Sequence, residues 1–230
     1  MDGDLIEMPQ VVILAGGLGT RLGAISKSVP KSLVRVAGKP VIGHILDWAC
    51  GQGCDRALVL TGHLGQMFDS YSHPTIELTF SREDFPLGTG GALWSSRELL
   101  EERFILLWGD DLHQIDYQSL VRTHLSCGDP LTMTVTTSYK NFNLEHRGGK
   151  VVRYDKRREK VSGLNGYEAG TSVVERRLLE TYGREGKWSW EERVYPLISG
   201  SISAHLDNTA FWDMGTPRRL ESLTKFLKDS

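Results

Sequence analysis

The most constraining feature of this chain is an apolar run that leads directly into a glycine-rich loop. Residues 11–14 are Val-Val-Ile-Leu, and the loop that follows is Gly16-Gly17-Leu18-Gly19-Thr20-Arg21. Such a run is typical of a short strand buried on both faces. Glycines then let the backbone turn sharply and approach a ligand closely, and the free N–H groups of such a loop bind anions. Because Arg21 and Lys31 add positive charge, the stretch predicts a polyphosphate site.

Spacing excludes two well-known glycine loops. A dinucleotide fingerprint needs G-x-G-x-x-G, but the sixth position counted from Gly17 is Leu22, and Arg21 lies inside the loop. A P-loop needs G-x-x-x-x-G-K-[ST], and the sequence contains no Gly-Lys-Ser or Gly-Lys-Thr. An ordinary glycine-rich turn is the simpler alternative, but such a turn rarely carries this pattern of charge.

The composition is that of an ordinary soluble protein and disfavours several other classes. The chain has 230 residues, 40% hydrophobic and 24% charged, which predicts one domain with a substantial core. A net charge of −2 does not suit a nucleic-acid partner, which normally meets a basic surface. The acidic residues 1–10 lack the apolar core of a signal peptide, and no apolar run approaches membrane length. Three cysteines without paired spacing favour a reducing cytoplasm.

Strand-like and helix-like segments alternate through the first half of the chain. Besides 11–14, the expected strands are 56–61, 75–81 and 104–108, and the expected helices are 41–49, 63–71 and 90–100. This alternation predicts an α/β fold of Rossmann-like type, with a mostly parallel sheet flanked by helices. Ligands of such sheets bind at the carboxyl ends of the strands. The glycine loop and the Asp110-Asp111 pair would both lie there.

From residue 131 the pattern changes to short segments rich in β-branched residues. The expected strands are 131–137, 151–154, 161–164 and 171–174, and the expected helices are 190–198 and 217–227, the latter with Pro217 in its first turn. Such strands suit a smaller sheet added to one side of the first. The charged stretch 156–160 predicts a solvated turn. With no internal repeat or linker, 1–230 is expected to be one domain, divided into residues 1–137, residues 138–217 and a C-terminal helix at 217–230.

The glycine loop resembles the signature of the sugar-1-phosphate nucleotidylyltransferases, G-G-x-G-T-R-L-x-P-x-T-x-x-x-P-K-P. The corresponding stretch here is GGLGTRLGAISKSVPKS, and the residues that match in place are Gly16, Gly17, Gly19, Thr20, Arg21, Leu22, Pro30 and Lys31. Ala24, Ser26 and Ser32 replace the family's Pro, Thr and Pro. Ser26 keeps a hydroxyl and Ala24 loses only rigidity, so the chemistry is unaffected. The looser form is most similar to the branch that guanylylates heptose 1-phosphate.

Two separate aspartates resemble the metal ligands of this family. Asp110 and Asp111 directly follow an apolar strand, where carboxylates suit Mg²⁺, although a capping aspartate is the simpler explanation. Gly109-Asp110 resembles the family's Gly-Asp motif, and Trp108 stands where Asn is common. The stretch 211–217, FWDMGTP, resembles the family's D-x-G-T-P. The resemblance implies that Asp110 and Asp213 hold Mg²⁺, with Asp111 as support.

The stretch 83–92, EDFPLGTGGA, resembles the family's E-x-x-P-L-G-T-A/G-G, whose glycine-rich part lines the nucleoside pocket. Its glycines would let backbone press against a flat base or sugar, and the helix after it would aim N–H groups at the ligand. A plain loop with a helix cap is the alternative. Together with the first loop, the resemblance implies these nucleotide-binding residues: Leu14, Ala15, Gly16, Gly17, Gly19, Thr20, Pro86, Gly88 and Thr89.

Three weaker matches in the second half imply the sugar-phosphate site. Asp155-Lys156 resembles the family's Glu-Lys pair, whose lysine meets the sugar phosphate, and Glu168-Ala169-Gly170 resembles its N-A-G. The stretch WSWEERVYP resembles F-S-x-E-x-D-x-x-P, with Arg193 in place of Asp. The implied sugar-phosphate residues are Lys156, Glu168, Gly170 and Glu191, the two glutamates as acceptors from sugar hydroxyls. A surface position is the alternative for each match.

The resemblance covers residues 11–217 and implies a nucleotidyltransferase of GT-A-like fold. A nucleoside triphosphate and a sugar 1-phosphate would give a nucleotide-sugar and pyrophosphate, with Mg²⁺ as cofactor. Arg21 and Lys31 would act on the triphosphate and Lys156 on the sugar phosphate. GTP with heptose or mannose 1-phosphate is the favoured pair. CTP, UTP, dTTP, a non-sugar acceptor such as phosphocholine, a non-catalytic regulatory module and a homo-oligomer stay open, and neither nucleic acid nor membrane is an expected partner.

Overall fold

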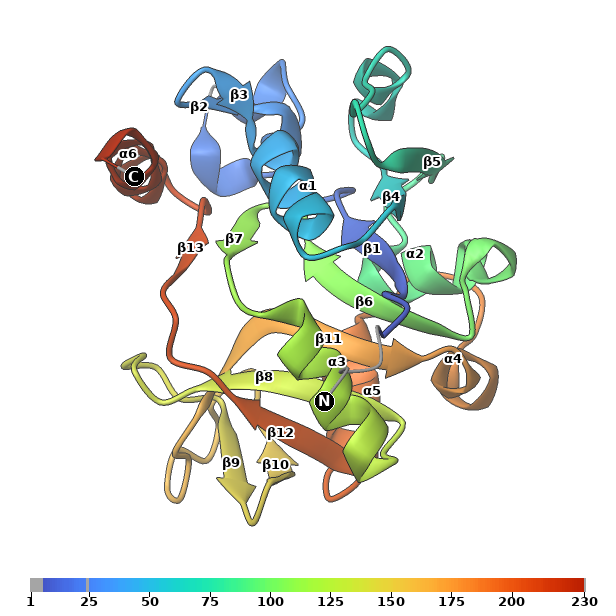
Figure 1. Ribbon diagram of the computed structural model, residues 1–230, viewed down its shortest axis with the longest axis vertical. Helices are drawn as coiled ribbons and strands as arrows, with labels where there is room; N and C mark the ends of the chain where they lie inside the picture. Colours follow the sequence, from blue (N-terminus) through green and yellow to red (C-terminus); the bar gives the residue numbers. More distant parts are fainter. Residues whose placement is uncertain (1–5, 24, 230) are drawn as a thin grey trace.

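One nine-stranded sheet runs through the part of the chain that the computed structural model describes, residues 6–23 and 25–229 (Figure 1). Residues 1–5 of the acidic N-terminal stretch and Ala24 of the glycine-loop signature lie outside the described residues. The strand order is β5-β4-β1-β6-β11-β8-β12-β10-β9. Its strands are β1 (Gln10–Leu14), β4 (Arg56–Thr61), β5 (Glu77–Arg82), β6 (Arg103–Trp108), β8 (Leu131–Thr136), β9 (Leu144–Arg147), β10 (Lys150–Tyr154), β11 (Tyr167–Glu175) and β12 (Ile202–Leu206).

The first four strands of this order are parallel, and both faces of the central ones are covered. In β1, Val12 lies between Leu58 of β4 and Leu106 of β6, and all three side chains are buried. Continuous apolar strands of this kind belong in parallel sheets covered by helices on both sides. The predicted α/β class is therefore confirmed, as are the predicted strands of the first half.

The strands of the second half add to one side of this same sheet. β11 pairs antiparallel with β6, and β8 and β12 pair parallel to each other. The strands expected at 131–137, 151–154 and 171–174 are present, the last within the longer β11. The strand expected at 161–164 is wrong. Leu164 N–H donates to Val161 O (3.2 Å) in a turn, and Gly163 has a φ of 83°, a value that suits a reversal and not a strand.

The helices are α1 (Val41–Gly51), α2 (Gly88–Ser95), α3 (Tyr117–Cys127), α4 (Arg177–Tyr182), α5 (Trp190–Leu197) and α6 (Pro217–Asp229). The helices predicted at 41–49, 190–198 and 217–227 are confirmed. The helix expected at 63–71 is only the 3-10 turn η4 (Gly65–Phe68), which follows Leu64 at a positive φ of 59°. The one expected at 90–100 is α2 followed by a separate 3-10 turn, η5 (Arg97–Leu99), since the α-helix ends at Ser95. The other 3-10 turns are η1 (Thr20–Leu22), η2 (Ile25–Lys27) and η3 (Lys31–Leu33).

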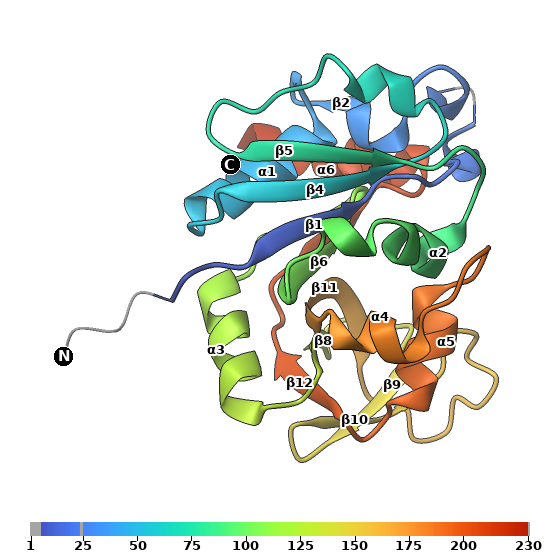
Figure 2. The ribbon, with the colours of Figure 1, turned by 90° about the vertical axis from the view of Figure 1, so that its right-hand side faces the viewer.

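Helices cover both faces of the sheet. Val11 and Ile13 of β1 pack into a core with α1, α3 and α6, whereas Val12 and Leu14 pack into a second core with α2, α4 and α5. Figure 1 looks onto the face that α1 and α3 cover, and the side view in Figure 2 has α3 on one side of the sheet and α2 and α5 on the other. The alternation of side chains along β1 thus joins two hydrophobic cores into one layered body.

Two short antiparallel ribbons lie outside the main sheet. One pairs β2 (Arg35–Val36) with β3 (Lys39–Pro40), and the other pairs β7 (Asp111–His113) with β13 (Phe211–Asp213). The second ribbon is the more important for function because it brings the end of the chain back to the residues that follow β6.

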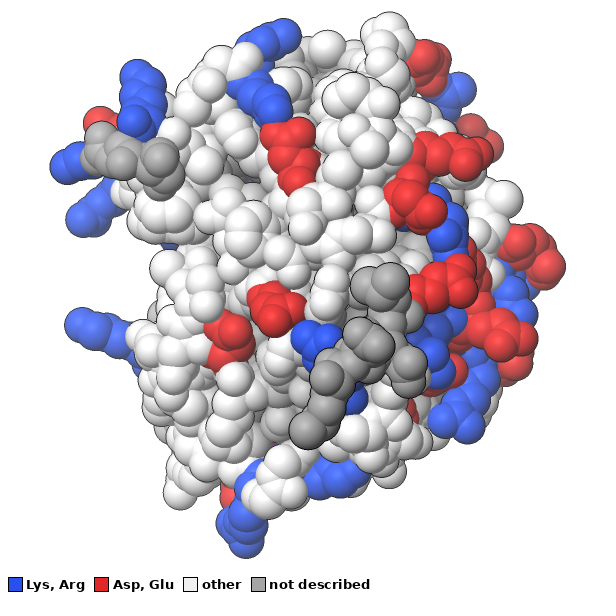
Figure 3. Space-filling view, in the orientation of Figure 1, with Lys and Arg blue, Asp and Glu red and all other residues white. Residues whose placement is uncertain are grey.

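On the face shown in Figure 3, acidic and basic side chains intermingle along one side, and much of the rest is uncharged. Charges of both signs therefore adjoin one another along that side (Figure 3). None of the described helices combines the length and the hydrophobicity that a bilayer crossing requires.

Candidate active site

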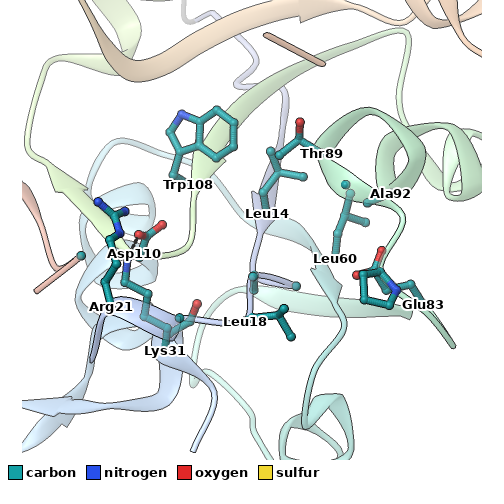
Figure 4. A pocket seen from close by; sticks show the side chains of 18 of the residues that line it. Leu14, Leu18, Arg21, Lys31, Leu60, Glu83, Thr89, Ala92, Trp108 and Asp110 are labelled. Carbon is teal, nitrogen blue, oxygen red and sulfur yellow. Dashed lines mark hydrogen bonds and ion pairs between the residues drawn. The ribbon is translucent and has the colours of Figure 1, made fainter. Parts of the chain in front are cut away.

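The glycine loop after β1 opens onto a cavity of about 420 Å³ at the carboxyl ends of the parallel strands (Figure 4). The start of the loop is fixed between neighbouring strands, because Ala15 N–H donates to Leu60 O (2.8 Å) and Gly109 N–H donates to Leu14 O (2.9 Å). Predicted residues that line the cavity are Leu14, Ala15, Gly16, Gly17, Gly19, Arg21, Lys31, Pro86, Gly88, Thr89 and Asp110. Thr20, also predicted, begins η1.

The two ends of this first cavity differ in chemistry. Figure 4 shows Arg21, Lys31 and Asp110 together at one end and Glu83 at the other. Glu83 Oε2 accepts a hydrogen bond from Leu87 N–H (3.0 Å). A Cβ atom added to Gly16 would lie 3.1 Å from Glu83 Oε1, so the absence of a side chain at Gly16 leaves room for the Glu83 carboxylate. One end is thus suited to phosphates and the other presents an acceptor to a base.

A second cavity, of about 440 Å³, lies beside the first. It is lined by Arg21, Trp108, Asp110, Asp111, Asn141, Asn143, Tyr154, Lys156, Arg158, Tyr167, Glu168, Gly170, Glu191, Phe211 and Asp213. All four predicted sugar-phosphate residues are among them. Arg21, Trp108 and Asp110 line both cavities, so ligands in the two cavities would meet at these three residues.

Three carboxylates gather where the cavities meet. Asp110 and Asp111 follow β6 directly, and in the β7–β13 ribbon Asp213 pairs with Asp111. Met214, which follows β13, donates its N–H to Asp110 O (3.0 Å), so the hydrogen bonding continues to the residue that precedes β7. One carboxylate oxygen from each of the three aspartates lies within 4.8 Å of the others. The predicted pair is therefore brought together, and Asp111 lies with it.

This donor set fits Mg²⁺. The cation prefers a small number of carboxylate oxygens together with phosphate oxygens and water. The three aspartates supply such oxygens beside both cavities. Burial, and then the charge of Asp213, raise the pKa of Asp111 to about 7 in the absence of a cation, as expected for like charges held together.

Side-chain cations already balance part of this negative charge. Lys31 forms an ion pair with Asp110, and Arg219 of α6 forms one with Asp213. Burial lowers the pKa of Lys31, whereas the carboxylates of Asp111 and Asp213 oppose that shift. Arg219 was not predicted, and it is held in turn by a hydrogen bond to Tyr139 Oη (3.3 Å).

Lys156 is held at the second cavity by Glu191. Lys156 Nζ donates to Glu191 Oε1 (2.5 Å), and the other carboxylate oxygen accepts from Ser189 Oγ (3.0 Å) and from Thr89 Oγ1. Glu191 is only 4% exposed. Its contacts suit a residue that positions Lys156, and acceptance from a sugar hydroxyl by Glu191 stays a prediction.

Glu168 and Gly170 shape the wall shared with Trp108. Tyr154 Oη donates to Glu168 Oε2 (2.9 Å), and burial, then the charge of Glu191, raise the pKa of Glu168 to about 7. Gly170 has a φ of 77°, and a Cβ atom there would lie 2.7 Å from Cδ1 of Trp108. Glycine at this position therefore lets the indole reach the junction of the cavities.

Arg193, which stands where the resemblance expects Asp, contacts Tyr182 and Trp188. Its Nε donates to Tyr182 O (3.1 Å) at the end of α4, and its guanidinium lies 5.9 Å from the centre of the Trp188 ring. It is not among the described residues that line either cavity. Arg193 therefore connects α5 with the end of α4 and with Trp188.

Several lining residues were not among those predicted from the sequence. Lys187 reaches the first cavity from the loop before α5, and the second cavity takes the following residues from loops and strand ends: Asn141, Asn143, Arg158, Tyr167 and Phe211. Tertiary packing brings them together. A signal was present at the following residues, since each lies in or beside a predicted motif: Glu83, Asp111, Tyr167, Lys187 and Phe211.

Comparison with known proteins identifies relatives over nearly the whole chain. The family model described as nucleotidyl transferase matches residues 10–194. The D-glycero-alpha-D-manno-heptose 1-phosphate guanylyltransferase of Aneurinibacillus thermoaerophilus is 27% identical over 90% of this chain and 94% of its own length. The mannose-1-phosphate guanylyltransferase catalytic subunit beta of Dictyostelium discoideum is 26% identical, and the match covers 91% of this chain but only 62% of that protein.

Solved structures show the same fold. HddC from Yersinia pseudotuberculosis, which was also solved complexed with GMP-PN, superposes with a TM-score of 0.79 at 26% identity, covering 96% of this chain and 100% of HddC. A putative glucose-1-phosphate thymidylyltransferase from Bacillus anthracis superposes with a TM-score of 0.83 at 17% identity, covering 96% of both chains, a likeness of fold alone.

Proposed function

The chain belongs to the nucleotidyl transferase family, and from this we propose that it transfers a guanylyl group from GTP to a sugar 1-phosphate of heptose or mannose type and releases pyrophosphate. The observation that carries this proposal is the junction of two cavities at Arg21, Trp108 and Asp110, beside three carboxylates. A triphosphate in the first cavity and a sugar phosphate in the second would have their reacting atoms at this junction.

The reaction needs little covalent help from the protein. A phosphate oxygen of the acceptor forms a bond to the α-phosphorus, the bond from that phosphorus to the bridging oxygen breaks, and pyrophosphate leaves with the electron pair. Arg21 and Lys31 bind the triphosphate, and Lys156 neutralises the acceptor phosphate so that the two anions can approach. Positioning and charge neutralisation account for most of the rate in such transfers.

We propose Asp110 and Asp213 as ligands of Mg²⁺, with Asp111 beside them. When bound there, Mg²⁺ supplies positive charge to phosphate oxygens. The proposal is supported by the grouping of the three carboxylates, and Lys31 and Arg219 hold Asp110 and Asp213 by ion pairs.

The preference for guanine rests on Glu83. A carboxylate only accepts hydrogen bonds, and guanine offers two adjacent donors, N1–H and the N2 amino group. In uracil and thymine the single N3–H lies between two carbonyl oxygens, and in cytosine the amino group adjoins the acceptor N3. A carboxylate at the base end of the cavity therefore favours GTP over UTP, dTTP and CTP. The names of the guanylyltransferase relatives and the GMP-PN complex of HddC support the same choice.

The proposals for the acceptor substrate and for the cellular compartment have weaker support. The relative that this chain covers over 94% of its length is named for heptose 1-phosphate, and Lys156 and Glu168 line the cavity that we assign to the sugar phosphate. We assign residues 1–137 mainly to the nucleotide and 138–217 mainly to the acceptor. We also propose a reducing cytoplasmic setting, since Cys50, Cys54 and Cys127 are all free thiols.

The test is pyrophosphate release with Mg²⁺ across five nucleoside triphosphates crossed with a panel of sugar 1-phosphates that includes heptose and mannose. We expect release confined to GTP with one of these sugars. Release with another nucleotide alone would overturn the guanine preference. Silence across the panel, with GTP still bound in calorimetry, would favour a regulatory module and overturn the proposed activity.

A further inference from the structure

The segment Gly186–Trp188, from the second half of the chain, contacts the second glycine-rich stretch of the first cavity, residues 87–91. Trp188 N–H donates to Leu87 O (2.9 Å), and Gly90 N–H donates to Trp188 O (3.0 Å). A Cβ atom on Gly90 would lie 2.1 Å from Cε3 of the Trp188 ring, and one on Gly91 would lie 2.4 Å from Gly186 O. These glycines were expected to admit a base or sugar, but the structure places the segment Gly186–Trp188 against them.

This anchoring fixes the position of Lys187. The residue lies between Gly186 and Trp188, which both contact the loop, and it lines the first cavity. Its side chain is exposed, and within residues 6–23 and 25–229 it takes part in no hydrogen bond or ion pair. The ammonium group is therefore available to a ligand.

Lys187 lies toward the Glu83 end of the cavity, because its neighbours Gly186 and Trp188 contact Gly88, Gly90 and Gly91, which follow Glu83 along the chain. Its positive charge acts on Glu83, where it opposes the effect of burial on the pKa of that carboxyl. Glu83 lies at the end opposite to Arg21 and Lys31 (Figure 4). The phosphate end thus has its own cations, and Lys187 is a separate cation beside the carboxylate that we assign to guanine.

The chemistry of guanine matches this pair of charges. Its O6 acceptor adjoins the N1–H donor, so a base whose N1–H and N2 amino group meet Glu83 turns O6 to the neighbouring position. Lysine only donates hydrogen bonds, and lysine or arginine at O6 or N7 is the commonest specific contact to guanine in nucleic-acid recognition. We propose that Lys187 is a specificity-determining residue that donates to O6 of the guanine base. This inference rests on the proposed function.

The consequence for other nucleotides is direct. Adenine carries an amino group at the position of O6, so it would present a donor to the ammonium group of Lys187 and no adjacent donor pair to Glu83. Glu83 would therefore accept hydrogen bonds from two donors of guanine, and Lys187 would donate one to its acceptor O6. The two contacts together distinguish guanine from adenine. The second of these contacts comes from Lys187, which lies outside the nucleotide half of the chain.

The experiment compares GTP with 6-thio-GTP, which keeps N1–H, the amino group and N7 but replaces O6 with sulfur, a weak acceptor. Steady-state kcat/KM is measured for the wild type, Lys187→Met and Lys187→Arg. Arg184→Met is the matched control, because it removes an exposed positive charge close by from a side chain that is not among the described cavity-lining residues.

We expect the wild type to prefer GTP over 6-thio-GTP by roughly tenfold, the usual scale for a charge-assisted hydrogen bond. Lys187→Met should lose roughly tenfold with GTP and change little with 6-thio-GTP, so that the preference disappears. Lys187→Arg should keep most of the preference, and Arg184→Met should keep all of it.

Equal losses with both nucleotides in Lys187→Met would mean that Lys187 meets the ribose or the phosphates, and this would overturn the inference. A wild type that uses both nucleotides equally would do the same. A wild type that fails with GTP but works with another nucleotide would instead refute the proposed function, so the two failures are distinguishable.

Discussion

Asp213 lies directly opposite Asp111 in the β7–β13 ribbon, although the two residues are far apart in the sequence. With Asp110 they form a group of three carboxylates that is only partly balanced by Lys31 and Arg219. Like charges at this separation repel, so a divalent cation should stabilise the folded chain as well as support turnover.

We therefore expect Mg²⁺ to raise the Tm of the wild type measured against EDTA, and EDTA to abolish pyrophosphate release. A cation at a hundredfold excess over its Kd stabilises by about 2.7 kcal/mol, which corresponds to several degrees for a chain of this size. The Mg²⁺-dependent rise should be lost in Asp213→Asn and kept in Asp69→Asn, an exposed aspartate not among the described lining residues. An unchanged rise in Asp213→Asn would contradict this ligand assignment.

Arg21→Ala and Asp110→Ala should each lower kcat/KM by a factor of about 10² to 10³ while the fold survives, because each removes a charge at the junction of the two cavities. Circular dichroism and Tm check the fold. Arg122→Ala removes an exposed arginine of α3 and should leave activity unchanged. Near-normal turnover in either of the first two variants would refute the assigned mechanism.

Glu83→Gln should weaken the choice between GTP and ITP, which lacks the N2 amino group. A good bidentate contact to a base discriminates by about 1–3 kcal/mol, which is roughly a 5- to 160-fold preference in kcat/KM. Glu77→Gln, an exposed residue of β5, is the matched control and should keep the wild-type preference. If Glu83→Gln also kept it, the guanine contact would have to lie elsewhere.

Glu168 should make stability fall as pH rises through the weakly acidic range. Burial raises its folded-state pKa from an ordinary value of 4.5 to about 7. Between these values the folded state holds a proton that the unfolded state has lost, so unfolding becomes easier as pH increases. Glu168→Gln keeps an acceptor for Tyr154 Oη and removes the titration. The Tm of the variant relative to the wild type should thus be higher at pH 8 than at pH 5, and a difference independent of pH would contradict the assignment.

The first half of the fold could be predicted because β1, β4 and β6 are largely apolar and are soon followed by glycines, whereas β5 alternates apolar and polar side chains. Helix α3 was not predicted, since its buried stripe includes His124. Its ends do carry signals, because Asp116 accepts from Ser119 N–H (2.8 Å) and Gly128 has a φ of 68°. The apolar residues Val161 and Leu164 resembled a strand but flank the turn at Gly163.

The predicted site residues that line a cavity belong to short sequence motifs. In these motifs the residue type at a position is limited by the backbone conformation or by the space around it. Gly170, for example, has a φ of 77°, and a Cβ atom there would lie 2.7 Å from Cδ1 of Trp108. The pairing of β7 with β13 could not be read from two three-residue strands. Lys187 adjoins the motif that begins at Trp188, but that motif predicted the sugar-phosphate site and not the first cavity, which Lys187 lines. Contacts of this kind depend on how distant segments pack and have no local pattern.

One carboxylate connects the two substrate cavities. Glu191 accepts from Thr89 Oγ1, on the wall of the first cavity, and from Lys156 Nζ, on the wall of the second. A nucleotide that displaces the Thr89 hydroxyl changes the partner set of Glu191 and hence the reach of Lys156 toward the acceptor. The two affinities are then thermodynamically linked, and by reciprocity the acceptor changes nucleotide affinity by the same factor. Glu191 is therefore the side chain through which occupation of one cavity would change binding in the other.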